Sequence, residues 1–165
     1  MPIRTLRCSW PNGCATRSSA LRIRAGLCAL LLLGGAAAAG APDAHVPLRV
    51  GSHIFHVEVA ATPPQRALGL MRRTHLARDA GMLFVFEQKG RHCFWMKNTL
   101  VPLSIAFLAD DGTIVELKAM QPRTQEPHCP TAPVRYALEV LQGEFENTGI
   151  KPGMRVSGGP FSARR

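Results

Sequence analysis

The middle of the chain alternates short apolar runs with turn residues, which is the pattern of consecutive β-strands. Three such runs predict strands at Met82–Phe86, Cys93–Met96 and Leu103–Leu108, separated by Gly, Asn and Pro. The Asp-Asp-Gly turn at 110–112 then predicts a hairpin into a further strand at 114–117, because Asp and Gly tolerate the positive φ angles of tight antiparallel connections. Together these runs predict an antiparallel sheet.

The segments on either side of this region complete the predicted fold. Residues 48–60 alternate around a Gly-Ser turn and predict two strands, and Thr62 followed by two prolines predicts the capped start of a short helix. Residues 136–141 predict another strand, with a helix as the rival interpretation, before a helical turn at 144–148 and a last strand at 154–157. The expected fold class is mainly β with minor α, as a small antiparallel sandwich or open barrel with one short helix.

The amino-terminal part of the chain differs in composition from the rest. Residues 1–24 contain five Arg and no acidic residue, and residues 25–40 are wholly apolar and end in small residues. This order is typical of a secretory signal peptide. The apolar stretch of about 15 residues is shorter than the roughly 20 of a membrane-spanning helix. We therefore expect a cleaved signal, with an uncleaved amino-terminal anchor as the alternative.

The chain is accordingly expected to have four parts. They are a signal peptide at 1–39, a linker at 40–47, a single β-rich domain at 48–157 and a disordered tail at 158–165. The expected location is outside the cytoplasm, either periplasmic or secreted, without stable membrane insertion once the signal has been cleaved.

The charge balance becomes ordinary when the leader is set aside. The whole chain carries 20 Lys and Arg against 11 Asp and Glu, a net charge of +9. Five of the basic residues lie in the leader, so 15 basic residues face 11 acidic ones in the remainder and the net charge falls to +4. No basic stripe interleaved with aromatic residues is present in the sequence, and we therefore expect no nucleic-acid partner.

Two cysteines remain outside the leader, Cys93 and Cys129. In an oxidising compartment they are candidates for a disulfide that closes a loop of about 35 residues. Two separate thiols and a pair of metal ligands are the rival interpretations.

Five sequence blocks occur in order between Pro64 and Val156: GLM, GMLFVF, FWMKNT followed by PL, YALEV and GIKPG. In this respect the chain resembles the domain of unknown function 192 family. The resemblance implies a compact, mostly β domain and no established biochemical activity. One position departs from the family pattern, because Ser104 stands where the family usually has Asp. A role that depends on a carboxylate at this position is therefore not carried over.

A candidate ligand-binding surface follows from the alternation within the FWMKNT block. If Phe94 and Met96 point into the core, Trp95 and Lys97 share the opposite face, next to the turn residue Asn98. An exposed Trp beside an ammonium and an amide is typical of a site for a small polar ligand. In the alternative interpretation, Trp95 belongs to the core and Asn98 stabilises the turn.

Arginines near the predicted helix extend this candidate surface. Arg66 on the helix and Arg72 at its end can hold carboxylate or phosphate groups through paired hydrogen bonds. Glu139, a lone acidic residue in a predicted strand, is expected to be exposed or paired with Arg135 or Lys97. The leading functional hypothesis is a binding or accessory module for a small polar or anionic ligand, such as an envelope saccharide.

Two other functional classes remain as alternatives. His92-Cys93 and His128-Cys129 suggest an enzyme or a metal-handling protein, because two imidazoles and two thiolates can bind zinc. Adjacent residues of a strand point to opposite faces, however, and a disulfide explains the cysteines more simply. The sequence contains no nucleophile elbow, zinc-protease motif, phosphate-binding glycine loop or Rossmann fingerprint, so no cofactor is expected. The other alternative is a structural interaction protein of the envelope.

Overall fold

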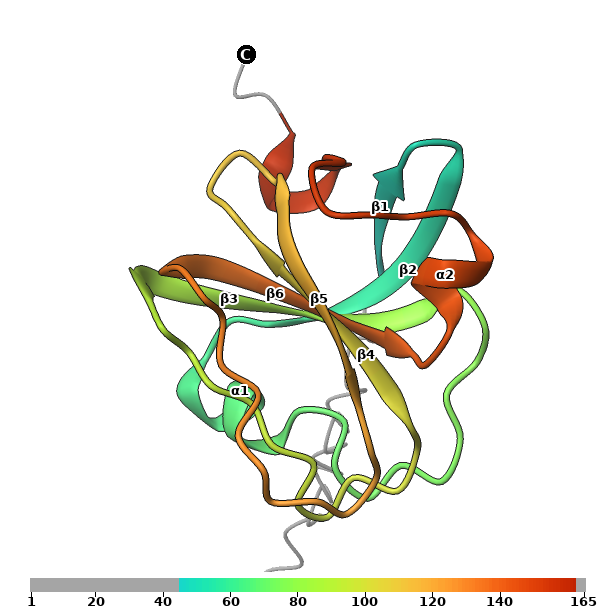
Figure 1. Cartoon of the computed structure of the whole chain (residues 1–165), viewed down its shortest axis with the longest axis vertical. Helices are drawn as coiled ribbons and strands as arrows, with labels where there is room; N and C mark the ends of the chain where they lie inside the picture. The colour runs from blue at the N-terminus through green and yellow to red at the C-terminus, as the bar shows by residue number, and fades with distance from the viewer. Residues whose placement is uncertain (1–44, 163–165) are drawn as a thin grey trace, which may run out of the picture. The chain divides into compact units, whose positions relative to one another are not determined.

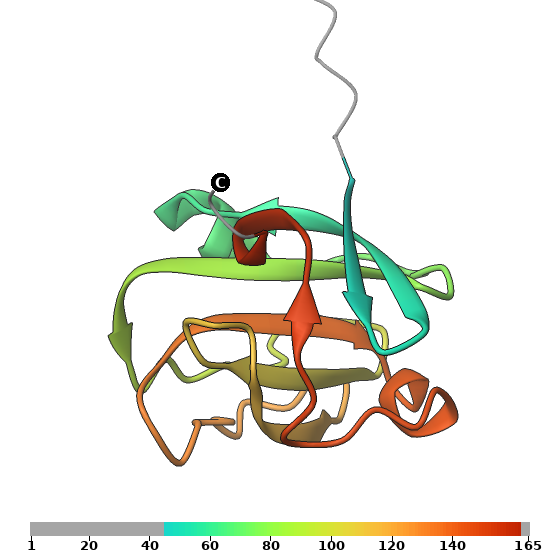
Figure 2. The ribbon, with the colours of Figure 1, turned by 90° about the horizontal axis from the view of Figure 1, so that it is seen from above.

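A computed structural model describes residues 45–162, which form one curled sheet of seven strands in the order β5-β4-β6-β3-β2-β1-β7 (Figures 1 and 2). The mainly β fold class and the open-barrel alternative are confirmed. The elements are β1 (Val46–Val50), β2 (His53–Ala60), α1 (Pro63–Leu68), β3 (Ala80–Gly90), β4 (Leu103–Leu108), β5 (Ile114–Met120), β6 (Val134–Leu141), α2 (Glu144–Asn147), β7 (Val156–Ser157) and a 3-10 turn η1 (Gly159–Phe161).

The sheet is mixed rather than purely antiparallel. Strands β2 and β3 pair in parallel, whereas the other neighbouring strands pair antiparallel. Parallel neighbours need a crossover connection, and the segment that contains α1 provides it. The helix begins as predicted at Thr62, whose hydroxyl accepts a hydrogen bond from the backbone of Gln65 while the Gln65 amide oxygen accepts one from the Thr62 backbone.

The two edges of the sheet meet at one end, which partly closes the barrel. The backbone N–H of Ile114 donates to the carbonyl of Met154 at 2.8 Å, and the N–H of Val156 donates to the carbonyl of Gly112 at 2.9 Å. These bonds join the start of β5 to the segment that leads into β7. They satisfy backbone groups that would otherwise remain open at two strand edges.

Apolar side chains form a separate core on each face of the sheet. The first core gathers residues from all seven strands, including Phe55 and Leu138. The second core lies on the opposite face and includes Phe84 and Ala137, together with residues of the segments that follow α1 and β3. All six residues of β4 are buried, and so are six of the eight in β6. A polar side chain within residues 136–140 of β6 is therefore removed from water on either face of the sheet.

One predicted strand is wrong. Residues Cys93–Met96 form part of an irregular loop and contribute only an isolated bridge between Phe94 and His128. The loop is extended because its backbone bonds to another loop instead of a strand: the N–H of Phe94 donates to the carbonyl of His128 at 3.0 Å, and the N–H of Met96 donates to that of Thr124 at 3.1 Å. The strand before it, β3, continues to Gly90, four residues beyond its predicted end.

The other predicted elements are close to those observed. The 103–108 strand, the hairpin after it and the strand at 136–141 are present, and no helix replaces the last of these. Strand β1 starts at Val46, inside the predicted linker, and η1 lies inside the predicted tail, where the ring of Phe161 packs 4.7 Å from that of Tyr136. The ordered fold therefore extends past 48–157 at both ends. The predicted signal peptide lies outside the described residues.

The helices of the described residues are all short. Helix α1 has six residues and α2 has four. Within residues 45–162, no helix has both the length and the apolar character that a membrane crossing requires.

Candidate functional site

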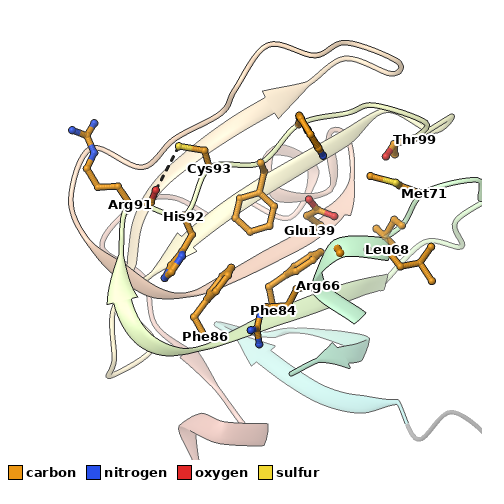
Figure 3. Close-up of a pocket in the computed structure, with 15 residues that line it drawn as sticks. Arg66, Leu68, Met71, Phe84, Phe86, Arg91, His92, Cys93, Thr99 and Glu139 are labelled. Carbon is orange, nitrogen blue, oxygen red and sulfur yellow. Dashed lines mark hydrogen bonds between the residues drawn. The ribbon is translucent and has the colours of Figure 1, made fainter. Parts of the chain in front are cut away.

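A cavity of about 610 Å³ lies against the second core, between helix α1 with the turn after it, strand β3 and the loop after β3 (Figure 3). Aromatic and aliphatic side chains make up about half of its lining: Leu68, Leu70, Met71, Phe84, Phe86, Phe94 and Trp95. Polar and charged side chains, including Arg66, Arg91, His92 and Glu139, contribute much of the rest. A concave site that combines apolar walls with convergent polar groups is the usual form of a small-molecule pocket.

Glu139 of β6 supplies the buried polar group of this cavity. Its side chain is 5% exposed, and it makes no hydrogen bond or ion pair with any residue between 45 and 162. Figure 3 shows its carboxyl group directed into the cavity. Burial disfavours the charged carboxylate and raises the pKa of Glu139 from 4.5 to about 8. The group is therefore mainly a neutral carboxylic acid at pH 7, able to donate one hydrogen bond and to accept others.

The sheet fixes the position of this carboxyl group. Glu139 lies between Met82 of β3 and Ile105 of β4 in the strand register, and both of these neighbours belong to the second core. Strand β3 approaches very closely here, since a Cβ atom on Gly81 would lie 2.4 Å from the Glu139 carbonyl oxygen. Gly81 therefore allows β3 and β6 to pair at the point where Glu139 enters the cavity.

Two arginines and a histidine lie at the rim of the cavity, and protein carbonyls or rings hold each of them. The guanidinium of Arg66 donates to the carbonyl of Val85 at 2.9 Å and lies 5.2 Å from the centroid of the Phe86 ring. Arg91 donates through Nε to a loop carbonyl at 3.2 Å. The ring of His92 stacks on the same Phe86 ring that Arg66 contacts, with ring centroids 3.6 Å apart. The rim thus presents positive charge held in place.

Two large apolar side chains at the cavity are exposed to solvent. Leu68 on α1 is 57% exposed and Trp95 in the loop is 54% exposed. Lys97 is also exposed, with its ammonium 5.7 Å from the centroid of the Trp95 ring, and Met96 between them is buried. The alternation expected for these residues is present, although the backbone that produces it is a loop.

The five ligand-binding residues expected from the sequence divide into two groups. Arg66 and Trp95 line the cavity. Lys97 is next to Trp95 but outside the cavity lining. Arg72 and Asn98 also lie outside the lining. The last two bond to each other through the backbone, because the Arg72 N–H donates to the Asn98 carbonyl at 2.8 Å. Both have positive φ angles, 63° and 60°, so they form turns that join α1 to the loop after β3.

Cys93 and Cys129 form a disulfide, with their Cα atoms 4.1 Å apart. The bridge joins the loop that forms one wall of the cavity to the loop before β6. With the disulfide formed, neither sulfur is a free thiolate. The thiol nucleophile and the cysteine metal ligands considered as alternatives are therefore not available in this structure.

Glu139 was not recognised as a site residue from the sequence, and the expected partners Arg135 and Lys97 do not bind it. Arg135 instead donates through Nε to the Phe86 carbonyl at 3.0 Å. The signal was present in the composition of residues 134–141, where Glu139 stands among apolar residues on both sides. A strand of that kind is usually buried on both faces, so its one carboxyl group is buried as well.

The fold and the cavity define a small β-rich domain with a buried carboxyl group in a pocket of aromatic and charged residues. This description specifies an architecture and a candidate site without a reaction. Residues 46–158 match the family model DUF192, described as "Uncharacterized ACR". The chain belongs to this family, as the sequence blocks indicated. Among curated proteins, none matches this chain.

Two solved structures are similar to this chain. One, from Sinorhizobium meliloti 1021, is described as "a putative transcription regulator"; it is 37% identical, with a TM-score of 0.68, over 72% of this chain and 96% of that one. The other, a protein of unknown function from Novosphingobium aromaticivorans DSM 12444, is 34% identical, with a TM-score of 0.66, over 72% of this chain and 94% of that one.

Ser104, which stands where the family usually has Asp, is buried on the face of the sheet opposite Glu139. Ser104 is 2% exposed, and its hydroxyl has no hydrogen-bond partner within the described part of the chain. It pairs in register with Val140 of the first core, whereas its neighbour Ile105 pairs with Glu139. Ser104 therefore contributes nothing to the cavity.

Proposed function

We propose that this protein is a binding module for a small ligand that occupies the Glu139 cavity. The observation that carries the proposal is a carboxyl group that is 5% exposed, has no partner among the described residues and is directed into a cavity of about 610 Å³. Burying a polar group without a hydrogen bond costs roughly 1 to 3 kcal/mol in proteins. A ligand that bonds to Glu139 removes this cost, and a titratable group with a shifted pKa in a cleft is a common mark of a functional site.

The chemistry of the cavity specifies the class of ligand. The neutral form of Glu139 donates to a carbonyl or ether oxygen and accepts from a hydroxyl. The aromatic walls, including Phe94 and Trp95, favour a ring or other flat apolar surface. Arg66 and Arg91 at the rim favour a carboxylate or phosphate, which a neutral Glu139 does not repel. A small polar molecule with an apolar face, such as a saccharide or a ring-bearing carboxylic acid, meets all three conditions.

The exposed apolar rim supports the same proposal. Leu68 and Trp95 together account for two of the four large apolar side chains that are exposed in the described residues. Both line the cavity, so a ligand seated there covers parts of them. The apolar area removed from water contributes about 25 cal/mol per Å² to binding.

We also propose that the protein acts outside the cytoplasm. The Cys93–Cys129 disulfide supports this location, because disulfides persist mainly in oxidising compartments. Fractionation of the native host tests it, followed by mass spectrometry of the protein with and without reductant. A protein recovered in the cytoplasm with two free thiols would overturn this part of the proposal.

We propose no nucleic-acid partner for this chain, and the description of the Sinorhizobium protein concerns that protein alone. Several arginines are already engaged: Arg66 and Arg135 bind carbonyls, and Arg73 binds Glu58. An electrophoretic mobility-shift titration with random-sequence DNA is expected to show no binding at physiological salt. Binding whose affinity falls steeply with salt would overturn this point.

Ligand screening tests the binding proposal directly. Monosaccharides and ring-bearing carboxylic acids are screened by the shift in thermal midpoint of the full chain, and hits are titrated by calorimetry. Trp95→Ala and Glu139→Gln are expected to weaken a true hit at least about tenfold, because each removes a cavity contact worth about 1.4 kcal/mol or more. Glu146→Gln, an exposed glutamate on α2, is the matched control and keeps the parent affinity.

The outcomes of the screen separate the two classes of function. A hit that loses affinity in both cavity variants but not in the control supports the binding module. If no compound of either class shifts the parent, and Trp95→Ala and Leu68→Ala instead abolish capture of a host envelope protein, the rim is a protein contact surface and the small-ligand proposal is wrong.

A further inference from the structure

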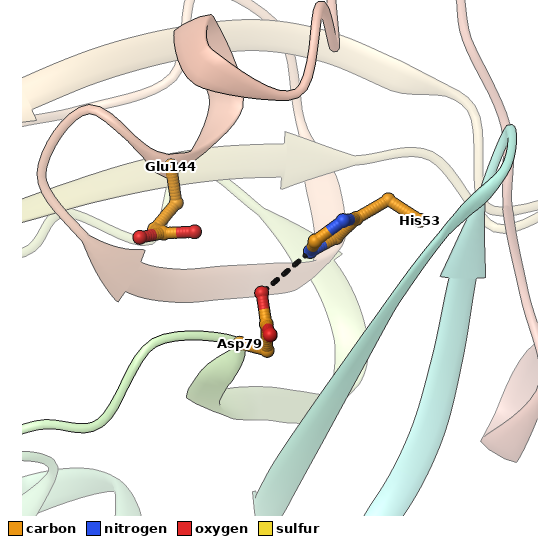
Figure 4. A group of neighbouring side chains, drawn as sticks. All are labelled: His53, Asp79 and Glu144. Atoms are coloured by element: carbon orange, nitrogen blue, oxygen red, sulfur yellow. Dashed lines mark ion pairs between the residues drawn. The ribbon is translucent and has the colours of Figure 1, made fainter.

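Three side chains that can bind a metal ion meet at a second place, away from the cavity lining. His53 begins β2, Asp79 directly precedes β3, and Glu144 is the first residue of α2. One ligand atom from each, a ring nitrogen or a carboxylate oxygen, lies within 4.8 Å of the other two. Figure 4 shows the three groups directed toward a common point from separate parts of the fold.

One of these side chains and a single ring nitrogen of another are buried without hydrogen bonds. Glu144 is 6% exposed, and its side chain has no hydrogen-bond or ion-pair partner among residues 45–162. The Nε2 atom of His53 is buried and makes no hydrogen bond in the same part of the chain, although it lies 2.9 Å from Oδ1 of Asp79. A ring nitrogen that close to a carboxylate oxygen, without the alignment of a hydrogen bond, leaves both groups incompletely satisfied.

An ordinary His–Asp ion pair does not explain the third group. A protonated His53 would balance one carboxylate, yet Glu144 would still be buried with no partner of its own. A doubly charged cation balances both carboxylates and also binds the lone pair of a neutral imidazole. The same ion would therefore satisfy all three side chains at once.

We propose that His53, Asp79 and Glu144 bind a divalent transition-metal ion of the Zn²⁺ class. Zinc binds imidazole nitrogen and carboxylate oxygen at about 2.0 to 2.2 Å, so two ligand atoms 2.9 Å apart subtend an angle of about 90° at the ion. The imidazole ligand favours Zn²⁺ and similar metals over Mg²⁺ and Ca²⁺, which prefer oxygen ligands alone. The Asp79 side chain is 48% exposed, which gives an ion access from solvent and leaves room for bound water.

The surrounding structure holds the three ligands in place. The His53 ring packs edge-on against Phe55 at 4.5 Å, and Phe55 packs against Phe145, the residue after Glu144, at 5.9 Å. Asp79 has a φ of 61°, and its carbonyl accepts a hydrogen bond from the N–H of His56 at 2.7 Å. Asp tolerates this left-handed conformation better than most residues do.

Titration of the metal-free, full-length chain with Zn²⁺ tests the proposal, using protein that carries no histidine tag. Calorimetry is expected to give one ion per chain, and saturating Zn²⁺ is expected to raise the thermal midpoint of unfolding. Mg²⁺ at the same concentration is expected to do neither. Co²⁺, used as a spectroscopic probe of the parent protein, is expected to give visible absorption bands of a site with nitrogen and oxygen ligands.

Matched variants assign the binding to the three residues. Glu144→Gln and Asp79→Asn are expected to weaken Zn²⁺ binding at least about tenfold. Glu146→Gln on the same helix and His56→Gln, an exposed histidine on the same strand as His53, are expected to bind as the parent does. Absence of saturable binding by the parent overturns the proposal, as does equal binding by the parent and Glu144→Gln. The Co²⁺ spectrum of the parent decides the question even if a variant fails to fold.

Discussion

The buried Glu139 carboxyl group predicts a decline in stability as the pH rises through neutrality. Its pKa is about 8 in the folded protein and 4.5 ordinarily. Between these two pH values the unfolded chain has released the proton and the folded chain has kept it. The folded state therefore binds more protons, and the free energy of unfolding falls as the pH rises; above pH 8 both states are ionised and the decline ends.

The magnitude follows from the difference between the two pKa values. Each pKa unit corresponds to about 1.4 kcal/mol, so the full shift predicts a total loss of about 5 kcal/mol, of which about 4 kcal/mol falls between pH 4.5 and pH 8. Because the side chain is 5% exposed, screening by water reduces this figure little. A small domain has a total stability of about 5 to 15 kcal/mol, so the predicted loss is a large fraction of it.

Glu139→Gln isolates this contribution, because glutamine has nearly the same shape and does not titrate. Urea unfolding followed by far-ultraviolet circular dichroism at pH 5, 6, 7 and 8 gives the free energy of unfolding of both proteins. We expect the stability of the variant relative to the parent to rise by about 4 kcal/mol over this range. Contributions from histidines and other carboxyl groups cancel in the difference between the two proteins.

Glu146→Gln, which removes an exposed carboxyl group from α2, provides the control. Its free energy of unfolding is expected to follow the pH dependence of the parent. If Glu139→Gln also differs from the parent by a constant amount at every pH, Glu139 titrates normally and the reasoning from its burial is wrong.

Three further predictions concern contacts around the fold. Arg73→Met removes the hydrogen bond that is the largest cause of the lowered pKa of Glu58. That bond stabilises the folded state above the ordinary pKa of a carboxyl group, so urea unfolding is expected to show a larger loss of unfolding free energy at pH 7 than at pH 3. Cys93→Ser opens a bridge between residues 36 apart in sequence, and the chain-entropy relation predicts a loss of about 4 kcal/mol in the same assay. Gly81→Ala places a Cβ atom 2.4 Å from a carbonyl on β6 and is expected to cost about 1 to 3 kcal/mol, seen as a lower thermal midpoint.

Local sequence patterns predicted those elements whose structure depends on short-range rules. Thr62 and the prolines after it predicted the start of α1, and the Asp-Asp-Gly turn predicted the hairpin between β4 and β5. The parallel pairing of β2 with β3 was not predicted, because strand direction depends on how a crossover packs on the sheet. The helix between two strands was the available indication of such a crossover.

The candidate site was predicted in part: the sequence indicated which side chain is exposed, but not which distant residues lie beside it. The alternation of Phe94, Trp95 and Met96 follows from any extended backbone, so Trp95 was correctly placed outward although the segment is a loop. Its companion in the cavity, Glu139, lies 44 positions further along the chain, and only the tertiary pairing of β3, β6 and β4 brings the two together. Local patterns contain no information about such an approach.

Two unpartnered buried carboxyl groups, five residues apart in the chain, underlie the two proposals. Glu139 lies within β6 and lines the cavity, whereas Glu144 begins the helix after that strand and faces His53. The sites share no residue, so each provides a control for the other: Glu139→Gln is expected to weaken the small ligand and to leave Zn²⁺ binding unchanged, and Glu144→Gln is expected to do the reverse. Burial disfavours the charged form of Glu139, so this group lowers the stability of the isolated domain when it is ionised. A domain that keeps buried carboxyl groups without partners, in place of apolar residues of similar size, is therefore better explained by binding than by folding alone.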